Sequence, residues 1–343
     1  MNNPQITSII PTFRRPETLQ RAIQSVLDQD YPNIKICVYD NNSQDETREV
    51  VLHLMSLDSR IEYFCHEENI GGLNNFLFAM ERVETDYFSF LSDDDYLLPE
   101  FYSKAINDLE NNPNSIFWAG MSLHVDEDNT IWYARLEQWK KEGVFVQPEG
   151  VFALTGGMAP AWTSILFRKT AIDKLGLLNI SLLGPSDLEY CLRLAVHYPY
   201  IIKKHPSAVF LLNPQSYSST QPLSSFWPGW KKMIEIFEND STLTTDIRKK
   251  LGNTLQKDAE KMLFRRGANA ISTGRLEFSK ATADALFFDC KKYFKASILY
   301  TITYICKKSN YAQKTYTTLY KKKEKSIIKS NKNSHIKYKH LLR

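Results

Sequence analysis

Residues 87–96, Tyr87-Phe88-Ser89-Phe90-Leu91-Ser92-Asp93-Asp94-Asp95-Tyr96, join an apolar, aromatic run to three consecutive carboxylates. An apolar run bounded by polar residues predicts a buried strand. Ligands of open α/β sheets bind beyond the carboxyl ends of the strands, so these acids fall where a ligand is expected. Adjacent acids repel one another unless a cation or solvent offsets their charge. The alternative interpretation is a solvated turn that caps a helix beginning near Pro99.

The chain upstream of this stretch alternates between strand and helix patterns. Strands are predicted at 6–10, 34–39 and 61–65, and each is followed by a helical pattern. This order over short connections predicts a mostly parallel sheet with helices on both faces, an α/β fold. Each strand ends in polar or small residues, which are Pro11-Thr12, Asp40-Asn41-Asn42 and Asn69-Ile70-Gly71-Gly72. These ends should converge at one edge of the sheet, as in a Rossmann-like nucleotide site, although no dinucleotide fingerprint or P-loop is present.

The second half of the chain continues this pattern and then changes. Strands are predicted at 115–123 and 164–167, and 126–143 is expected to form loops or a hairpin. Asp187 falls in the first turn of a helix that starts after Gly184-Pro185-Ser186. Beyond Gln221 the pattern is helical only. We therefore predict a catalytic-type α/β domain at 1–220, a helical C-terminal extension at 221–320 and a basic, flexible tail at 321–343.

Composition limits the compartment and the partners. No apolar run approaches the roughly 20 residues of a membrane span, and the N-terminus lacks the pattern of a signal peptide. Five scattered cysteines without metal-ligand spacing suit a reducing cytoplasm. Residues 291–343 carry 15 Lys and Arg against one acid, a net charge of +14, whereas the rest of the chain carries −10. A basic end with interleaved aromatic residues predicts contact with an anionic membrane surface, and no nucleic-acid-binding module accompanies it.

Five motifs occur together in a fixed order: S-I-I-P-T-F-R-R-P from Ser8, V-Y-D-N-N-S-Q-D-E-T from Val38, E-N-I-G-G from Glu68, L-S-D-D-D from Leu91 and D-L-E-Y-C-L-R-L-A from Asp187. Over roughly the first 220 residues the chain thereby resembles the family 2 nucleotide-sugar glycosyltransferases, which are inverting enzymes of the GT-A fold. Each motif is weak alone, but their order and spacing are specific.

The resemblance implies a donor site at the strand ends. Pro11 and Thr12 would line the nucleotide pocket. Asp40 would accept a hydrogen bond from the base, with Asn42 nearby, and Gly71 would let the backbone approach the nucleotide. Turn formation is the alternative role for Asp40.

The resemblance also assigns the acids. Asp93 would lie near the ribose, Asp94 beside it, and Asp95 would bind a divalent metal, Mn²⁺ or Mg²⁺. Hard divalent cations prefer oxygen ligands and offset the charge of a departing diphosphate. Asp187 would be the general base that removes the proton of the acceptor hydroxyl, and Glu189 is the second candidate. A helix-dipole acid is the structural alternative for Asp187.

The chain departs from the family pattern at two positions. Ser186 replaces the acid that usually precedes the base, and Asn213 replaces a histidine after the last core strand. A nucleotidyltransferase, which would also use a sheet edge, a metal and phosphates, is one alternative. The two departures keep a second alternative open, a catalytically impaired sugar-nucleotide-binding or scaffold protein. The first would be expected to have glycines after its first strand, where this chain has Pro11-Thr12-Phe13-Arg14-Arg15.

The sequence thus predicts a cytoplasmic, peripherally membrane-associated, metal-dependent inverting glycosyltransferase. The favoured donor is a UDP-sugar, and the acceptor is a saccharide or lipid-linked saccharide in bacterial surface polysaccharide synthesis, such as O-antigen or capsule. The sequence does not define the transferred sugar, the linkage or the oligomeric state.

Overall fold

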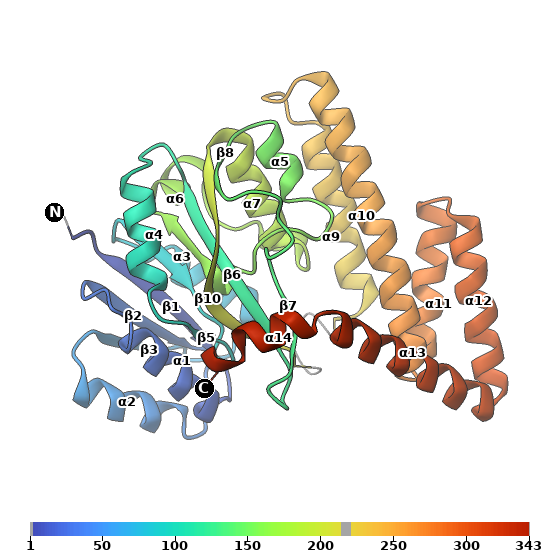
Figure 1. Ribbon diagram of the computed structural model, residues 1–343, viewed down its shortest axis with the longest axis horizontal. Helices are drawn as coiled ribbons and strands as arrows, with labels where there is room; N and C mark the ends of the chain where they lie inside the picture. Colours follow the sequence, from blue (N-terminus) through green and yellow to red (C-terminus); the bar gives the residue numbers. More distant parts are fainter. Residues whose placement is uncertain (1–2, 214–220, 343) are drawn as a thin grey trace.

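The computed structural model describes residues 3–213 and 221–342, and a ten-stranded mixed sheet lies at its centre (Figure 1). The main strand order is β3-β2-β1-β4-β9-β6-β10-β5, with β7 beside β6 and β8 beside β10. The strands are β1 (Ile6–Thr12), β2 (Ile34–Asp40), β3 (Ile61–Cys65), β4 (Tyr87–Phe90), β5 (Tyr96–Leu97), β6 (Phe117–Val125), β7 (Ile131–Ala134), β8 (Gly143–Phe145), β9 (Ile165–Arg168) and β10 (Tyr200–Leu211).

The first four strands form the parallel half that the sequence predicts. β1 lies between β2 and β4, and β3 pairs with β2, all in parallel. Buried β-branched residues dominate β1 and β2, buried aromatic residues dominate β4, and polar residues follow the strands at one edge. The connecting helices are α1 (Pro16–Leu27), α2 (Thr47–Leu57), α3 (Gly72–Met80) and, after β5, α4 (Phe101–Glu110).

The other half makes the sheet mixed. β9 is antiparallel to both β4 and β6, whereas β10 is parallel to β6. The hairpin predicted within 126–143 is present as β7, antiparallel to β6. Short helices connect these strands: α5 (Glu149–Ala153), η1 (Trp162–Ser164), α6 (Thr170–Leu175), η2 (Ile180–Leu182) and α7 (Ser186–His197). The α/β fold class is confirmed, and the antiparallel β9 depends on pairing between distant segments.

Helices cover both faces of the sheet. Alternate residues of one strand point to opposite faces, so Ile10 belongs to the cluster beneath α1, α2 and α4, whereas Ile9 belongs to the cluster beneath α3 and α7. Both side chains are fully buried. The two clusters fix the strand ends on a rigid support.

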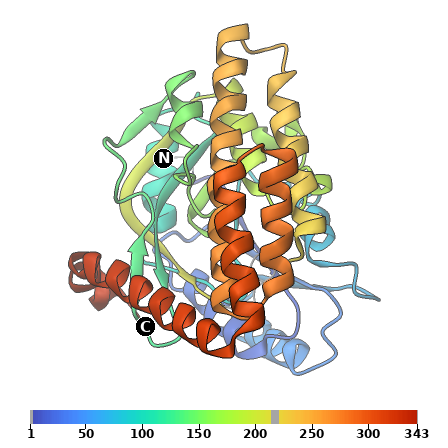
Figure 2. The same ribbon diagram turned by 90° about the vertical axis from the view of Figure 1, so that its right-hand side faces the viewer.

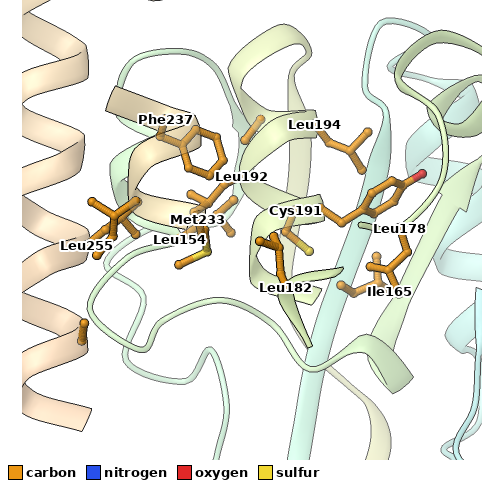
Figure 3. Packing of buried hydrophobic residues seen from close by; sticks show 14 of the residues in the cluster. Leu154, Ile165, Leu178, Leu182, Cys191, Leu192, Leu194, Met233, Phe237 and Leu255 are labelled. Carbon is orange, nitrogen blue, oxygen red and sulfur yellow. The ribbon is translucent and has the colours of Figure 1, made fainter. Parts of the chain in front are cut away.

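The region beyond residue 221 is helical, as predicted. It contains α9 (Leu223–Glu238), α10 (Thr245–Ser272), α11 (Leu276–Asp284), a π-helical turn η3 (Ala285–Asp289) and α12 (Tyr293–Lys308). Figure 2 shows α11 and α12 upright beside the long α10. In Figure 3, Leu255 of α10 and Phe237 of α9 pack in the same apolar cluster as Leu192 of α7. The extension therefore shares a continuous core with the sheet domain.

The C-terminal segment differs from the predicted flexible tail. α13 (Asn310–Ser330) runs through the expected boundary at 320/321, and α14 (Lys332–Tyr338) and η4 (Lys339–Leu341) follow it. Asn331 Nδ2 donates to the Trp132 carbonyl at 2.7 Å, and Tyr338 is buried against the sheet next to β7. The high lysine content predicted disorder, but Tyr338 supplies an apolar anchor.

The expected boundary at 220/221 adjoins residues 214–220, which lie outside the described residues, so the domain limits stay a prediction. Within 3–213 and 221–342, none of the helices combines the length and the apolar character needed to cross a bilayer.

Candidate functional site

The polar ends of β1, β2 and β4 meet at one edge of the sheet. Thr12 and Asp40 are register partners at the last pair of β1 and β2. Thr12 Oγ1 donates to Asp93 Oδ2 at 2.9 Å, and the Phe13 amide donates to the same oxygen at 3.3 Å. The structure therefore brings Thr12, Asp40 and Asp93 together, as the strand pattern predicted. Pro11 lies buried in β1 opposite Tyr39.

Arg15 binds two of the three consecutive acids. Its Nη1 lies 3.0 Å from Asp93 Oδ1 and 2.6 Å from Asp94 Oδ2. Burial alone would lower the pKa of Arg15, but the two carboxylates outweigh it and raise that pKa. Arg21 Nη2 also donates to the Asp94 carbonyl at 2.8 Å. The strand pattern alone did not single out Arg15, although its position directly after a polar strand end was an available signal.

Burial dominates the electrostatics of Asp93. It raises the pKa of this carboxyl to about 6, Arg15 opposes the shift, and the neighbouring Asp94 adds to it. Asp93 is thus a buried acid that needs the positive charge of Arg15, or of a ligand, to stay ionised near neutral pH.

Asp95 is buried and only partly hydrogen-bonded. Its Oδ1 accepts the Leu211 amide at 2.9 Å, whereas Oδ2 has no hydrogen-bond partner in the described structure. Burial, with a contribution from Asp94, raises the pKa of Asp95 well above its usual value. The nearby Thr163 hydroxyl weakens this shift, but its geometry does not meet that of a hydrogen bond. A buried acid with a bare oxygen lacks an interaction that a cation or a donor could supply.

The carboxylate of Asp40 is occupied by the protein itself. Oδ1 accepts the amide and the hydroxyl of Ser43 at 2.9 and 2.6 Å, and Oδ2 accepts the Tyr63 hydroxyl at 2.6 Å. Burial, followed by this hydrogen bond, raises the pKa of Tyr63. Each carboxylate oxygen can accept more than one bond, so the base-binding role of Asp40 stays a prediction.

Asn42 and Gly71 shape the loops beside Asp40. Asn42 has a φ of 63°, and its Nδ2 donates to the Glu67 carbonyl at 3.1 Å. Gly71 has a φ of +84°, and a Cβ built there would meet no atom within 4 Å. The backbone at Gly71 therefore borders open space in a conformation that favours glycine, and its contact with a nucleotide is untested.

Asp187 opens into a cavity of about 370 Å³. Asp187 is exposed to solvent on one side. The protein atoms packed around it nevertheless reduce the hydration of its carboxylate and raise its pKa. The Leu188 amide, which donates to Oδ1 at 2.7 Å, opposes that shift, as does Arg135 to a smaller extent. A solvent-accessible carboxylate with a raised pKa suits a group that accepts a proton.

Glu189, the second candidate base, is held elsewhere. It is 2% exposed, and its Oε1 and Oε2 accept Arg193 Nε at 2.8 Å and Nη2 at 3.2 Å. Arg193 also donates to the carbonyls of Leu175 and Leu177. This closed ion pair anchors α7 to the loop after α6, and Glu189 does not line the cavity.

The short helix η1 connects the acidic cluster with the cavity. Thr163 faces Asp95, and the adjacent Trp162 lines the cavity and donates from Nε1 to the Asp187 carbonyl at 3.4 Å. The Trp162 ring also packs 4.9 Å from that of Phe90, at the end of β4. No local pattern identified Thr163, because its role depends on the antiparallel placement of β9.

The acidic cluster supplies only some of the ligands that a divalent cation needs. The described residues contain no group of three or more His, Cys, Asp or Glu side chains placed to hold a metal. The bare Oδ2 of Asp95 fits one carboxylate ligand, and Mg²⁺ and Mn²⁺ sites are commonly completed by substrate phosphates and water. The residues therefore suit a metal that binds together with a diphosphate.

Comparisons with known proteins agree with the motifs. Residues 7–168 match the family model for Glycosyl transferase family 2. A GalNAc(5)-diNAcBac-PP-undecaprenol beta-1,3-glucosyltransferase of Campylobacter jejuni is 38% identical over 96 residues, which are 28% of this chain and 31% of the relative. The putative teichuronic acid biosynthesis glycosyltransferase TuaG of Bacillus subtilis is 28% identical over 128 residues, or 37% of this chain and 51% of TuaG. The matches thus span about a third to a half of these two relatives.

Solved structures extend the likeness to the whole fold. TarS 1–349 of S. aureus, crystallised with UDP-GlcNAc, superposes with a TM-score of 0.65 at 14% identity, covering 82% of this chain and 79% of that one. Another crystal structure of TarS 1–349 gives a TM-score of 0.60 and covers 93% of this chain and 91% of the other. At this identity the likeness concerns the fold, and it includes part of the helical extension.

Proposed function

We propose that this chain, whose residues 7–168 match the Glycosyl transferase family 2 model, is a glycosyltransferase that transfers a sugar from a nucleotide-diphosphate sugar to a hydroxyl of a saccharide acceptor with inversion. The observation that carries this proposal is the position of Asp187. Its carboxylate opens into a cavity that η1 links to the acidic cluster after β4. A donor site and a proton acceptor are therefore neighbours.

The strand ends bind the donor in this proposal. Asp40 and Thr12 flank the nucleoside at the ends of β2 and β1, and Asp93 contacts the ribose while Arg15 keeps it ionised. Gly71 leaves room for the backbone to approach the nucleotide. The solved structures support a UDP-sugar as the donor, because TarS 1–349 was crystallised with UDP-GlcNAc and with UDP.

Asp187 acts on the acceptor. It takes the proton of the acceptor hydroxyl as that oxygen bonds to the anomeric carbon, and the bond from that carbon to the diphosphate breaks with both electrons on the leaving oxygen. A base of this kind contributes about 10²–10⁴-fold to the rate. A single displacement inverts the anomeric centre and needs no covalent nucleophile.

Asp95 would hold a divalent metal, Mn²⁺ or Mg²⁺, through its bare Oδ2. When bound, such a cation stabilises the negative charge of the departing diphosphate. Arg15 binds Asp93 and Asp94, which leaves Asp95 as the acid of the three without a protein cation at hydrogen-bond distance among the described residues.

A panel of UDP-sugars, each assayed with Mn²⁺, with Mg²⁺ and with a chelator, tests the proposal by UDP release and by the anomeric configuration of the product. We expect metal-dependent release for one donor and an inverted product. In Asp95→Asn the thermal stabilisation by Mn²⁺ with UDP should shrink, while Asp173→Asn, at an exposed acid of α6 outside the cluster, serves as the control. Full transfer under chelation would contradict the role of Asp95, and nucleotide binding without transfer to any acceptor would favour a binding protein.

We expect the basic C-terminal helices to bind the anionic lipids at the inner face of the cell membrane. Phe294 and Tyr311 are 80% and 81% exposed, in a region of net charge +14. Amphipathic aromatic and basic residues bind such surfaces. Vesicles containing phosphatidylglycerol should sediment the protein, and pure phosphatidylcholine vesicles should not. Phe294→Ser should weaken sedimentation, while Leu57→Ser, at a 70% exposed residue of α2, should not. Equal binding to both vesicles would refute an electrostatic contact.

A further inference from the structure

The cavity at Asp187 has one wall that comes from outside the region matching the family model. Residues 154–162 and the start of α7 form one side, and α9 and α10 form the other. The residues contributed by α9 and α10 are Phe226, Trp230, Asp258, Lys261, Met262 and Arg265. The helical extension is therefore part of the cavity as well as support for the sheet.

The acid on this wall has a hydrogen-bond partner, whereas its two basic residues have no ion-pair partner among the described residues. Asp258 Oδ2 accepts the Gly156 amide at 2.5 Å, so this acid is engaged across the cavity. Lys261 and Arg265 are exposed on α10, and no carboxylate of the described chain lies within 4.0 Å of either one. Arg135 faces the cavity from the opposite side and donates to the Ala159 carbonyl. Three cations thus border a cavity whose second acid is the proposed base Asp187.

A further arginine, Arg266, lies beside this wall. The Arg266 guanidinium stands 4.2 Å from the centre of the Phe226 ring. Burial lowers the pKa of Arg266, and its neighbours Arg275 and Arg265 lower it further. Arginine binds phosphate and carboxylate groups with paired hydrogen bonds, as Arg265 in the cavity lining is able to do.

The remaining lining is suited to a saccharide. Trp162 and Trp230 contribute indole rings from η1 and α9, and Phe226 adds a third aromatic side chain. Ligand pockets combine such apolar surfaces with a few polar groups that fix orientation. In Figure 3 Met233 and Phe237 of α9 pack with Leu255 of α10, so the wall that carries Trp230 and Lys261 is rigidly attached.

We propose that this cavity binds the acceptor and that Lys261 and Arg265 bind an anionic group, a phosphate or a carboxylate, on the acceptor saccharide. The inference rests on the proposed transferase function, because that function makes Asp187 the group next to the acceptor hydroxyl. It adds the class of acceptor and assigns its recognition to α10, beyond residues 7–168. A solvated helix face is the competing explanation for the two cations.

Binding of small saccharides separates these explanations without requiring the natural acceptor. The probes are glucose 1-phosphate, glucuronic acid and methyl glucoside, which share a ring and differ in charge. Trp162 and Trp230 line the cavity, so intrinsic tryptophan fluorescence reports occupancy. We expect at least one charged probe to bind about 10-fold or more tightly than methyl glucoside, and the tighter of the two identifies phosphate or carboxylate.

The variants are Lys261→Ala with Arg265→Ala, Arg265→Lys alone, and Lys249→Ala as the control. Lys249 is an exposed residue of the same helix that does not line the cavity. The double variant should lose the preference for charged probes, whereas Arg265→Lys and Lys249→Ala should largely keep it. UDP affinity, measured by calorimetry, should be the same in all variants.

Three results would overturn the proposal. They are equal binding of charged and uncharged probes, unchanged preference in the double variant, and no binding of any probe at millimolar concentration. Loss of UDP affinity in the double variant would instead place the donor diphosphate at Lys261 and Arg265, which also contradicts an acceptor site. A wild-type protein that binds charged saccharides but no nucleotide would refute the transferase function and leave the anion site intact.

Discussion

The contrast between Asp187 and Glu189 gives the sharpest test of the site. The two acids lie in the first turn of α7, only two residues apart, but their surroundings differ. Asp187 opens into the cavity, whereas Glu189 is buried in a two-point pair with Arg193. Conservative amide substitutions should therefore separate chemistry from stability.

Glu189→Gln should reduce stability and leave catalysis intact. Hydrogen bonds to charged groups contribute about 1.5–3 kcal/mol each, and breaking a buried pair costs about 3–5 kcal/mol. The oxygen of the introduced amide would keep one acceptor, and the Arg193 side chain is 22% exposed and keeps its two backbone carbonyls. We therefore expect the free energy of unfolding to fall by about 2–3 kcal/mol. Turnover per folded molecule should stay within about 2-fold, since Glu189 does not line the cavity that contains Asp187.

Asp187→Asn should give the opposite result. The amide oxygen can still accept the Leu188 amide, and burial already disfavours the charged form of Asp187, so stability should not fall. Without a proton acceptor the turnover number should drop about 10²–10⁴-fold at unchanged UDP affinity. Urea unfolding, UDP release and calorimetry on both variants measure all three quantities. A stable Glu189→Gln protein that has lost transfer, or an Asp187→Asn protein that keeps it, would refute the assignment.

Three further predictions concern the supports of the site. In Gly229→Ala the new Cβ would overlap the Leu182 carbonyl oxygen, so α9 must move; we expect a loss of about 1–3 kcal/mol in urea unfolding together with weaker binding of saccharide probes, and an unchanged protein would show that this contact is loose. Burial lowers the pKa of His124 to about 3, so between about pH 6.5 and pH 3 the folded protein binds fewer protons than the unfolded chain, and its stability should fall by up to about 1.4 kcal/mol per pH unit on acidification. His124→Phe, which can keep the ring stacking, should show a shallower pH dependence of unfolding, and an identical slope would refute this role. Tyr338→Ala should release α14 locally, so amide exchange at 334–340 should rise about 10-fold while the global unfolding midpoint changes little, and a large global loss would mean that α14 unfolds only with the core.

The N-terminal fold was predictable because its signals are local. The apolar strands at 6–10, 34–39 and 61–65 end in polar residues and alternate with helical patterns, and β1 to β3 begin at the predicted residues. The antiparallel β9 was not predictable, because its pairing joins Phe167 to Phe88 across 79 positions of sequence. The docking of α14 was hidden by the lysines around Tyr338, since charge patterning predicts disorder and does not register a single buried anchor.

The candidate site follows the same division. Thr12, Asp40 and Asp93 were found because they terminate neighbouring parallel strands, and the sheet brings them together. Arg15 and Thr163 were missed because their contacts with acids depend on side-chain reach and on β9. Sequence reasoning also left Glu189 open as a base, since only packing reveals that Arg193 encloses it.

The three consecutive acids have different environments, and the groups proposed for the donor and for the acceptor lie in different parts of the chain. Arg15 neutralises Asp93 and Asp94 from the end of β1, whereas Asp95 faces η1 with a bare oxygen. The residues proposed to bind the donor thus lie within residues 7–168, which match the family model. Asp187, Lys261 and Arg265 lie beyond that region and line a cavity that residues 154–162 complete, and a continuous apolar core holds α7, α9 and α10 against the sheet. Among the described residues no hydrogen bond or ion pair joins Thr12, Asp40, Asp93 or Asp95 to α10, so we expect substitutions in α10 to change the acceptor without changing the donor.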